Sequence, residues 1–156
     1  MTSAAPGFIH EPAADHPGWH SWNLADPGLF NPQAMGRMLV RPELALDGTQ
    51  RARLRMFPER RHANLLEAVH GGVILALIDI SLFAAIRLVT RADPAGSVTL
   101  DLSTQFIAGG RLDIPLDAVC DVLRETRRLV FLRGTVEQAG EVVAAYQGTV
   151  RKPSAS

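Results

Sequence analysis

The sequence predicts an α+β fold in which a curved antiparallel β-sheet wraps around a long central α-helix. The first observation is an almost unbroken apolar run over residues 73–89, which contains only Asp79 and Arg87 as charged residues. This run is too long for an ordinary strand, and its length and its two charges argue against a membrane span. The second observation is that strand-like segments with turn signals lie on both sides of the run. A helix that is apolar nearly all round has to be buried, and these strands supply the cover.

Composition narrows the classes of function. The chain of 156 residues is long enough for one domain with a core, and its formal net charge of zero gives no sign of a nucleic-acid or membrane partner. The one cysteine, Cys120, excludes an internal disulfide and suits a reducing compartment. The N-terminus lacks the basic start and apolar core of a signal peptide. We therefore expect a soluble, cytoplasmic protein.

The first 35 residues are expected to form an N-terminal arm that is partly disordered. Residues 1–17 are rich in Ala, Pro, His and Gly, and we expect them to be loosely ordered. The apolar side chains between Trp19 and Phe30 predict a short helix or a docked arm. Residues 36–152 then form the folded domain, and residues 153–156 form a tail.

Two strands are expected before the helix. Residues 38–40 start the first one, which Pro42 disturbs. Residues 50–57 alternate between apolar and basic side chains, as in a half-buried antiparallel strand. The basic residues of this strand are Arg51, Arg53 and Arg55. They either bind phosphate or, as we favour, form a solvated strand face that blunts a sheet edge.

Four strands are expected after the helix, and they follow one another directly. They cover residues 98–106, 116–124, 129–138 and 141–151. A tight turn at Ala139-Gly140 joins the last two and indicates a hairpin. In the first of these strands the alternation predicts that Val98, Leu100, Leu102 and Phe106 share one face and that Thr99 lies on the other. One sheet covers only part of an all-apolar helix, so we expect a second subunit to cover the remainder.

The helix carries two features that point to chemistry. Gly71 and Gly72 leave a bare helix N-terminus, where backbone N–H groups lack internal partners and the dipole is positive. Such donors suit a carbonyl oxygen that becomes negative during a reaction. Asp79 lies farther along among apolar residues, where a carboxylate is costly unless something pairs with it or uses it. The glycines alone could be only a tight entry to the helix, but for Asp79 we favour a functional role.

A longer pattern carries a family resemblance. Asn64 is followed after five residues by His70-Gly71-Gly72 and after six more by Asp79, and a strand beginning at Val98 follows the helix. This pattern resembles the hotdog-fold acyl-CoA thioesterases of the phenylacetate-degradation (PaaI-like) group. The resemblance implies a sheet around a central helix, assembly into homodimers or homotetramers, and active sites at the dimer interface. It also implies an acyl-CoA substrate and no separate cofactor, because coenzyme A is part of the substrate.

The resemblance also implies roles for single residues. Asp79 matches the catalytic carboxylate, which acts as nucleophile or as base for water. Gly71 matches the residue whose N–H polarises the thioester carbonyl, and Asn64 matches an amide that helps to hold the carbonyl or the water. Further expected substrate contacts are His70 and Gly72 in the same loop and Thr99 near the attacking water; for His70 we favour a role in shaping the loop over that of a general base. Phe83 replaces a threonine of some relatives, so either water positioning falls to Thr99 alone or Phe83 shapes an acyl pocket.

Charge alone makes Arg128, beside Arg127, a candidate for binding the phosphates of coenzyme A, although such a pair is usually a charged turn. No metal is expected, because the five histidines show no ligand spacing. A Ser-His-Asp triad has no support, because no serine lies in a nucleophile-elbow pattern.

The leading hypothesis is hydrolysis of an acyl- or aryl-CoA thioester to the free acid and coenzyme A. Two alternatives stay open. A non-catalytic acyl-CoA-binding or regulatory hotdog domain would not need Asp79. A hotdog enoyl-CoA hydratase would need an Asp–His pair a few residues apart at the start of the helix, and no such pair is present.

Overall fold

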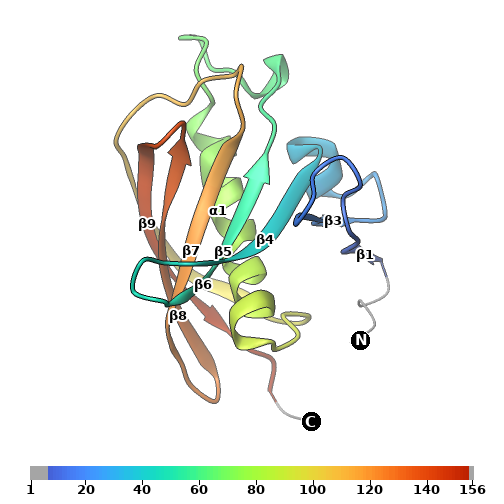
Figure 1. Ribbon diagram of the computed structural model, residues 1–156, viewed down its shortest axis with the longest axis vertical. Coiled ribbons are helices and arrows are strands. Elements are labelled where there is room, and N and C mark those ends of the chain that lie inside the picture. Colours follow the sequence, from blue (N-terminus) through green and yellow to red (C-terminus); the bar gives the residue numbers. More distant parts are fainter. Residues whose placement is uncertain (1–6, 155–156) are drawn as a thin grey trace.

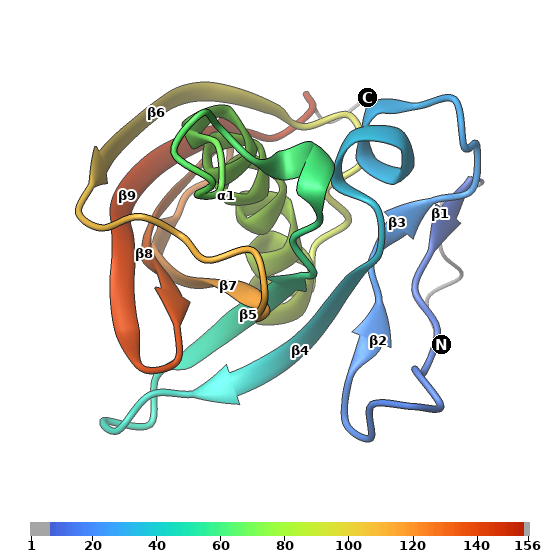
Figure 2. The same ribbon diagram turned by 90° about the horizontal axis from the view of Figure 1, so that it is seen from above.

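The computed structural model describes residues 7–154, and its main element is an antiparallel sheet curled around one helix (Figures 1 and 2). The helix α1 spans Gly71–Ala85 and continues as a π-helical segment over Ile86–Thr90. The strands of the sheet are β2 (His20–Ser21), β4 (Met38–Leu44), β5 (Gln50–Met56), β6 (Val98–Phe106), β7 (Leu116–Glu125), β8 (Leu129–Gln138) and β9 (Glu141–Arg151). Their order across the sheet is β2-β4-β5-β7-β8-β9-β6. The predicted α+β architecture is confirmed.

The strand predictions agree closely with the structure after the helix and less well before it. β6, β8 and β9 have the predicted bounds, and β7 is longer by one residue. β4 is longer than predicted, because it runs through Pro42 to Leu44. Its neighbour β2 pairs only with Leu39 and Val40. From Arg41 onward, β4 therefore has a free edge on that side. Proline is tolerated there, because a missing N–H on a free edge breaks no ladder hydrogen bond.

Helix α1 is the centre of the hydrophobic core. Its buried side chains include Ile74, Leu77, Ile78 and Leu82, which pack with inward-facing residues of the surrounding strands. The segment Gly71–Thr90 is long and apolar enough to cross a membrane, and an 18-residue window of it has a mean hydropathy of 2.3, but half of that window is buried inside the fold, as in a core helix. One stripe of α1 is not covered by the sheet: Leu75 remains 38% exposed.

The N-terminal segment is a docked arm beside β4 (Figure 2). Its strands β1 (Phe8–Ile9) and β3 (Asn23–Leu24) pair with each other, while Trp22 is buried in the core. The Phe8 ring meets the Trp22 ring edge-on at a centroid distance of 4.6 Å. The sequence predicted loose order for residues 1–17. Residues 7–17 instead belong to this arm, because its aromatic side chains pack on one another and on the core; residues 1–6 lie outside the described part of the chain.

A β-bulge in β6 changes which residues face the helix. Thr99 pairs with Val150 and Asp101 pairs with Thr149, so Leu100 is an extra residue without a partner. The extra residue reverses the alternation at this point, so the predicted faces are wrong for Val98, Thr99 and Leu100, whereas Leu102 beyond the bulge packs against the core as expected of the apolar face. Thr99 faces α1, where its hydroxyl contacts Asp79, while Leu100 is exposed. The bulge therefore aims a polar side chain at the helix.

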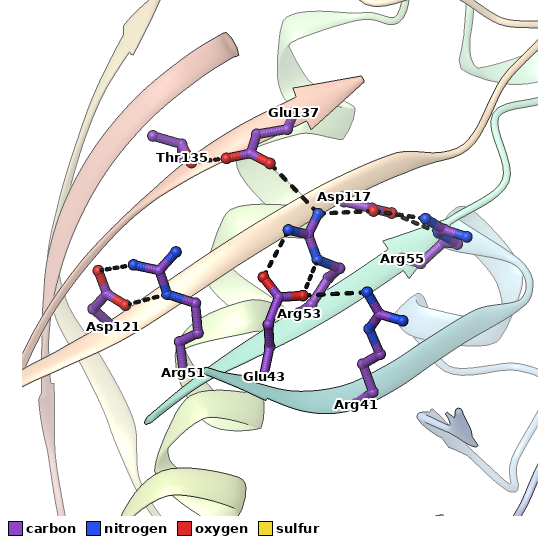
Figure 3. Close-up of polar contacts among 9 residues, drawn as sticks. All are labelled: Arg41, Glu43, Arg51, Arg53, Arg55, Asp117, Asp121, Thr135 and Glu137. Carbon is purple, nitrogen blue, oxygen red and sulfur yellow. Dashed lines mark hydrogen bonds and ion pairs between the residues drawn. The ribbon is translucent and has the colours of Figure 1, made fainter. Parts of the chain in front are cut away.

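The arginine row of β5 is neutralised by carboxylates from neighbouring strands (Figure 3). Arg53 contacts Glu43 at 2.6 Å and Asp117 at 3.1 Å, and Arg51 contacts Asp121 at 2.9 Å. Hydrogen bonds from Arg53 hold the pKa of Glu43 below its ordinary value. β5 lies between β4 and β7, so the row does not blunt a sheet edge as predicted. With each arginine of this row paired to a carboxylate, a phosphate-binding role has no support.

Candidate active site

Asp79 lies on the side of α1 that faces the start of β6. Its carboxylate is half-buried and is not enclosed in the core as the apolar sequence around it predicts. The Thr99 hydroxyl donates a hydrogen bond to Oδ1 of Asp79 over 2.7 Å. The other carboxylate oxygen, Oδ2, has no hydrogen-bond partner among residues 7–154. One oxygen is therefore held in place, and the other is free to accept a proton or to attack.

Asp79 opens onto a pocket of about 460 Å³. The side chains of Asp79, Phe83 and Arg87 line one wall, because residues four apart on a helix lie on the same face. The rest of the lining is mostly apolar and comes from the N-terminal arm and from the turn at Asp93–Ala95. A carboxylate at the rim of an apolar pocket is the arrangement that a general base or nucleophile acting on an apolar substrate needs.

The N-terminus of α1 forms a second, more open pocket. It is lined by Arg60, Ala63, Asn64, Leu65, Leu66 and His70. His70 Nδ1 accepts a hydrogen bond from the Gly72 N–H over 2.8 Å, and so His70 caps the helix and occupies that donor. The Gly71 N–H has no acceptor among the described residues. It is the first-turn donor that remains free for a ligand.

The packing around Gly71 does not itself require glycine. A Cβ added at this position would lie 3.5 Å from two ring carbons of Phe106, which is an ordinary contact. At Gly72 the same atom would lie only 3.1 Å from His70 Nδ1, which is tight. The absence of a side chain at Gly71 therefore keeps the free N–H approachable, whereas at Gly72 it relieves crowding.

Asn64 is tied to its loop by one side-chain atom only. Its Oδ1 accepts hydrogen bonds from the N–H groups of Leu66 at 2.9 Å and Ala68 at 3.1 Å. Its Nδ2 makes no hydrogen bond within the described part of the chain. The side chain thus holds the turn in place with its oxygen and leaves an amide donor beside the helix N-terminus.

Within one chain, the two pockets lie at different levels of α1. Gly71 and Asp79 are eight residues apart, which corresponds to roughly 12 Å along a helix axis. A reacting carbonyl needs its attacking group and its oxyanion donor at about 3 Å each. One chain therefore cannot place Gly71 and Asp79 of the same helix on one carbonyl.

The structure brings the predicted residues together in two groups. Asp79, Thr99 and Phe83 form the first, and Asn64, His70, Gly71 and Gly72 form the second. Arg128 belongs to neither. It lies exposed in the turn between β7 and β8, and its guanidinium is 3.4 Å from the Ser154 hydroxyl.

Some pocket residues were missed by sequence reasoning. Arg87 follows Asp79 and Phe83 at the same four-residue spacing, so the sequence held a signal for it. Phe8, Trp22 and Leu29 approach from the arm, and nothing local in the sequence relates them to Asp79.

Two other nucleophile candidates are buried. Burial raises the pKa of the Cys120 thiol to about 12. The Ser81 hydroxyl donates to the Ile78 carbonyl over 2.7 Å and contacts the Tyr146 hydroxyl at 2.9 Å. Both groups serve packing and neither faces a pocket. Among the described residues, no group of three or more His, Cys, Asp or Glu side chains is placed to hold a metal ion.

The same fold occurs in solved structures. The E. coli PaaI protein from the phenylacetic acid degradation operon superposes with a TM-score of 0.65 at 16% identity, covering 83% of this chain and 88% of that one. Zebra fish thioesterase superfamily member 2 gives 0.65 at 21% identity, covering 82% and 88%. The BH2602 protein from Bacillus halodurans, solved with CoA, gives 0.57 at 25% identity, covering 64% and 65%. These likenesses establish the hotdog fold.

The sequence establishes the family. Residues 66–145, about half of the chain, match the Thioesterase superfamily, and the chain belongs to this family. No curated protein matches the chain. The family resemblance predicted from Asn64, His70-Gly71-Gly72 and Asp79 is confirmed. The match begins two residues after Asn64 and includes the complete helix α1 with both glycines and Asp79.

Proposed function

We propose that the protein is an acyl-CoA thioesterase, which converts a thioester and water to a carboxylic acid and coenzyme A. The observation that carries the proposal is the half-buried Asp79 carboxylate, held by Thr99 at 2.7 Å and open to a largely apolar pocket, in a chain of the Thioesterase superfamily. Such a pocket suits the acyl part of the substrate. A coenzyme A complex of a structural neighbour supports the thiol part.

In the proposed reaction, Asp79 either takes a proton from the attacking water or attacks the carbonyl carbon directly. The Thr99 hydrogen bond fixes Oδ1, so that Oδ2 faces the reacting group. The Gly71 N–H and the Asn64 amide stabilise the negative charge that develops on the carbonyl oxygen. In the water route the C–S bond then breaks, the acid is released, and the thiolate of coenzyme A takes up the proton that Asp79 removed. In the direct route the departing thiolate takes up a proton from solvent, and water then hydrolyses the anhydride formed on Asp79, which releases the acid and restores the carboxylate. Base catalysis contributes about 10²–10⁴-fold, and one oxyanion donor contributes about 10²–10³-fold.

The proposed site is completed by a second copy of this chain. Because Gly71 and Asp79 of one helix are too far apart, the oxyanion donors next to Asp79 come from the helix N-terminus of a partner. The exposed apolar surface around the donor loop supports this assembly: Leu65 is 102% exposed and Leu66 is 87% exposed. Strand β6, at the free edge of the sheet, exposes Leu100 and Phe106 as well. Several large apolar side chains exposed in this way suit a surface that a partner covers.

The two alternatives are disfavoured by specific contacts. A hydratase needs an Asp–His pair, but His70 Nδ1 is occupied by the Gly72 N–H, and His70 lies in the other pocket from Asp79. A domain that only binds acyl-CoA gives no reason for a carboxylate with a free oxygen at the rim of an apolar pocket. Thiol release separates this second alternative from an enzyme directly.

The proposal is tested by thiol release over a panel of aryl, short and long acyl-CoA substrates, with Asp79→Asn as the comparison variant. The amide keeps the shape of the side chain and the contact with Thr99, but loses charge and basicity. We expect turnover to fall by about 10²–10⁴-fold with a smaller change in acyl-CoA binding. Near-normal turnover of Asp79→Asn would remove the catalytic assignment. Binding without thiol release by the wild-type protein would favour the binding domain.

A further inference from the structure

The N-terminal arm forms one side of the Asp79 pocket. Helix α1 contributes Asp79, Ile80 and Phe83 to the lining, its π-helical continuation contributes Arg87, and the turn before β6 contributes residues 93–95. The opposite wall comes from the arm, through Gly7, Phe8, Trp22, Leu24, Asp26, Leu29 and Asn31. About half of the lining is therefore supplied by a segment that lies at least 40 residues before the helix in sequence.

This wall lies outside the part of the chain that defines the family. The family match covers residues 66–145, and every arm residue of the pocket precedes it. The arm is nevertheless part of the fold, because Trp22 is buried in the core and β2 pairs with β4 of the main sheet. The catalytic wall of the pocket thus lies in the matched segment, and the facing wall comes from residues that precede it.

We propose that the arm is the specificity element of the enzyme, and that it selects a neutral, apolar acyl group with at least the bulk of a six-membered ring. This inference rests on the proposed thioesterase function and adds the substrate class. Residues 7–31 shape the space that the acyl group occupies, while Asp79 acts on its carbonyl at the rim.

The size and the lining of the pocket support this class. An apolar cavity of about 150 Å³ is enough to bind benzene, and the pocket has about three times that volume, at 460 Å³. Phe8, Trp22 and Phe83 place aromatic rings on both walls, and Leu24 and Leu29 add aliphatic side chains to the lining. Aromatic walls bind apolar groups through large contact areas and favour ring edges in particular. An acetyl group would leave most of this surface without contacts.

The charges of the pocket argue against an acidic acyl group. Arg87 is the only base in the lining, its side chain is 13% exposed, and its guanidinium lies 3.6 Å from Asp93. Asp26 adds a second carboxylate, whose Oδ1 accepts the Gly28 N–H over 2.8 Å. Apart from Asp79, the lining therefore carries two carboxylates, Asp26 and Asp93, and one guanidinium, Arg87. A carboxylate on the acyl group would meet net repulsion there, so a neutral acyl group fits best.

Leu29 and its neighbour Phe30 provide a matched test. Both side chains are largely exposed, but only Leu29 lines the pocket. Leu29→Trp adds bulk to the pocket wall, and Phe30→Trp adds a similar group beside it on the outside. For each protein, kcat/KM is measured with acetyl-CoA, with a series of straight-chain acyl-CoAs and with phenyl-bearing acyl-CoAs. The ratio of bulky to acetyl substrate is the readout.

We expect the wild-type protein to prefer the bulky acyl groups over acetyl. Leu29→Trp should lower that preference by about tenfold or more, because one added or lost group in an apolar pocket changes discrimination by about 10–200-fold. Phe30→Trp should keep the wild-type ratio. The phenyl-bearing and straight-chain series show which kind of bulk the pocket accepts. An unchanged ratio in Leu29→Trp, or a wild-type preference for acetyl, would overturn the inference.

Binding separates this inference from the proposed function. Calorimetric titration with thioether analogues of the same acyl-CoAs, which cannot be hydrolysed, needs no catalysis. If the wild-type protein releases no thiol but binds bulky analogues more tightly than the acetyl analogue, and Leu29→Trp removes that difference, the thioesterase proposal fails and the pocket assignment stands. Equal affinity of the wild-type protein for bulky and acetyl analogues contradicts the pocket assignment, whatever the activity.

Discussion

The two pockets along helix α1 differ in what they offer a substrate. The pocket at the first turn offers donors, the Gly71 N–H and the Asn64 amide, and it is open. The pocket two turns later offers an acceptor, the Asp79 carboxylate, and a mostly apolar wall. A thioester needs both, because its carbonyl oxygen requires donors and its carbon requires an attacking group. Each pocket is therefore half of a site, and two copies of the chain can make two complete sites.

After Asp79→Asn, the largest effect is expected from a small change in the donor half. Asn64→Asp keeps an oxygen that can accept the N–H groups of Leu66 and Ala68, but it removes the Nδ2 donor. We expect turnover to fall by about 10²–10³-fold, with little change in melting temperature. Steady-state kinetics and thermal unfolding check this. A loss of folding with normal turnover in the folded fraction would assign Asn64 to structure alone.

Mixing two inactive proteins tests whether the two halves come from different subunits. Asp79→Asn and Asn64→Asp each destroy one half. In a mixed dimer with shared sites, one site carries both changes and the other carries neither. Random exchange makes about half of the dimers mixed, so roughly a quarter of wild-type activity should return. If each site lay within one subunit, activity would stay at the level of the variants, even where mass spectrometry shows that subunits have exchanged.

A smaller effect is expected at the hydrogen bond that orients the acceptor half. Thr99→Val removes the hydroxyl 2.7 Å from Asp79 but keeps the branched shape. A hydrogen bond to a charged group contributes about 1.5–3 kcal/mol, so turnover should fall by roughly tenfold or more. Thr99→Ser retains the hydroxyl and should recover most of that loss. Equal turnover in the valine and serine variants would show that the hydroxyl does not act on Asp79.

The smallest effect on function is expected on the face of the sheet that carries the β5 arginines and Glu43. The ion pairs on this face contribute to stability and take no part in the proposed site. The folded-state pKa of Glu43 lies below its unfolded value of 4.5, because Arg53 donates hydrogen bonds to it. The ionised Glu43 carboxylate therefore stabilises the folded state above about pH 4.5, and this stabilisation is lost as the pH falls through the lower folded-state pKa.

Glu43→Gln should lower the melting temperature at pH 7 by about 2–4 °C, which corresponds to about 1 kcal/mol. The difference from wild type should shrink in acid, and thiol release should be unchanged. Glu11→Gln, at an exposed carboxylate without an ion pair in the described residues, is the control. A Glu43→Gln difference that grows as the pH falls would contradict the assigned direction of the pKa.

Much of the fold could be predicted from the sequence because its signals are local. The apolar run of the helix and the alternation in β5 each depend on a few neighbouring residues. α1 with its π-helical continuation extends the predicted run by two residues at its start and one at its end, and β5 ends one residue earlier than predicted. The catalytic candidates Asp79, Gly71 and Asn64 came from a short, contiguous pattern. Spacing within one helix can also explain why Phe83 lies beside Asp79.

Tertiary structure decided what no local pattern contains. The bulge at Leu100 turns Thr99 toward Asp79, and a single extra residue is invisible in an alternating sequence until its partner strand is placed. The carboxylates that neutralise the β5 arginines come from other strands, up to 84 positions away. The arm forms half of the Asp79 pocket because Phe8 and Trp22, which lie far from α1 in sequence, pack on the core beside this helix. The sequence by itself thus determined the elements and the reactive groups, whereas the long-range packing decided which groups meet and what the pocket accepts.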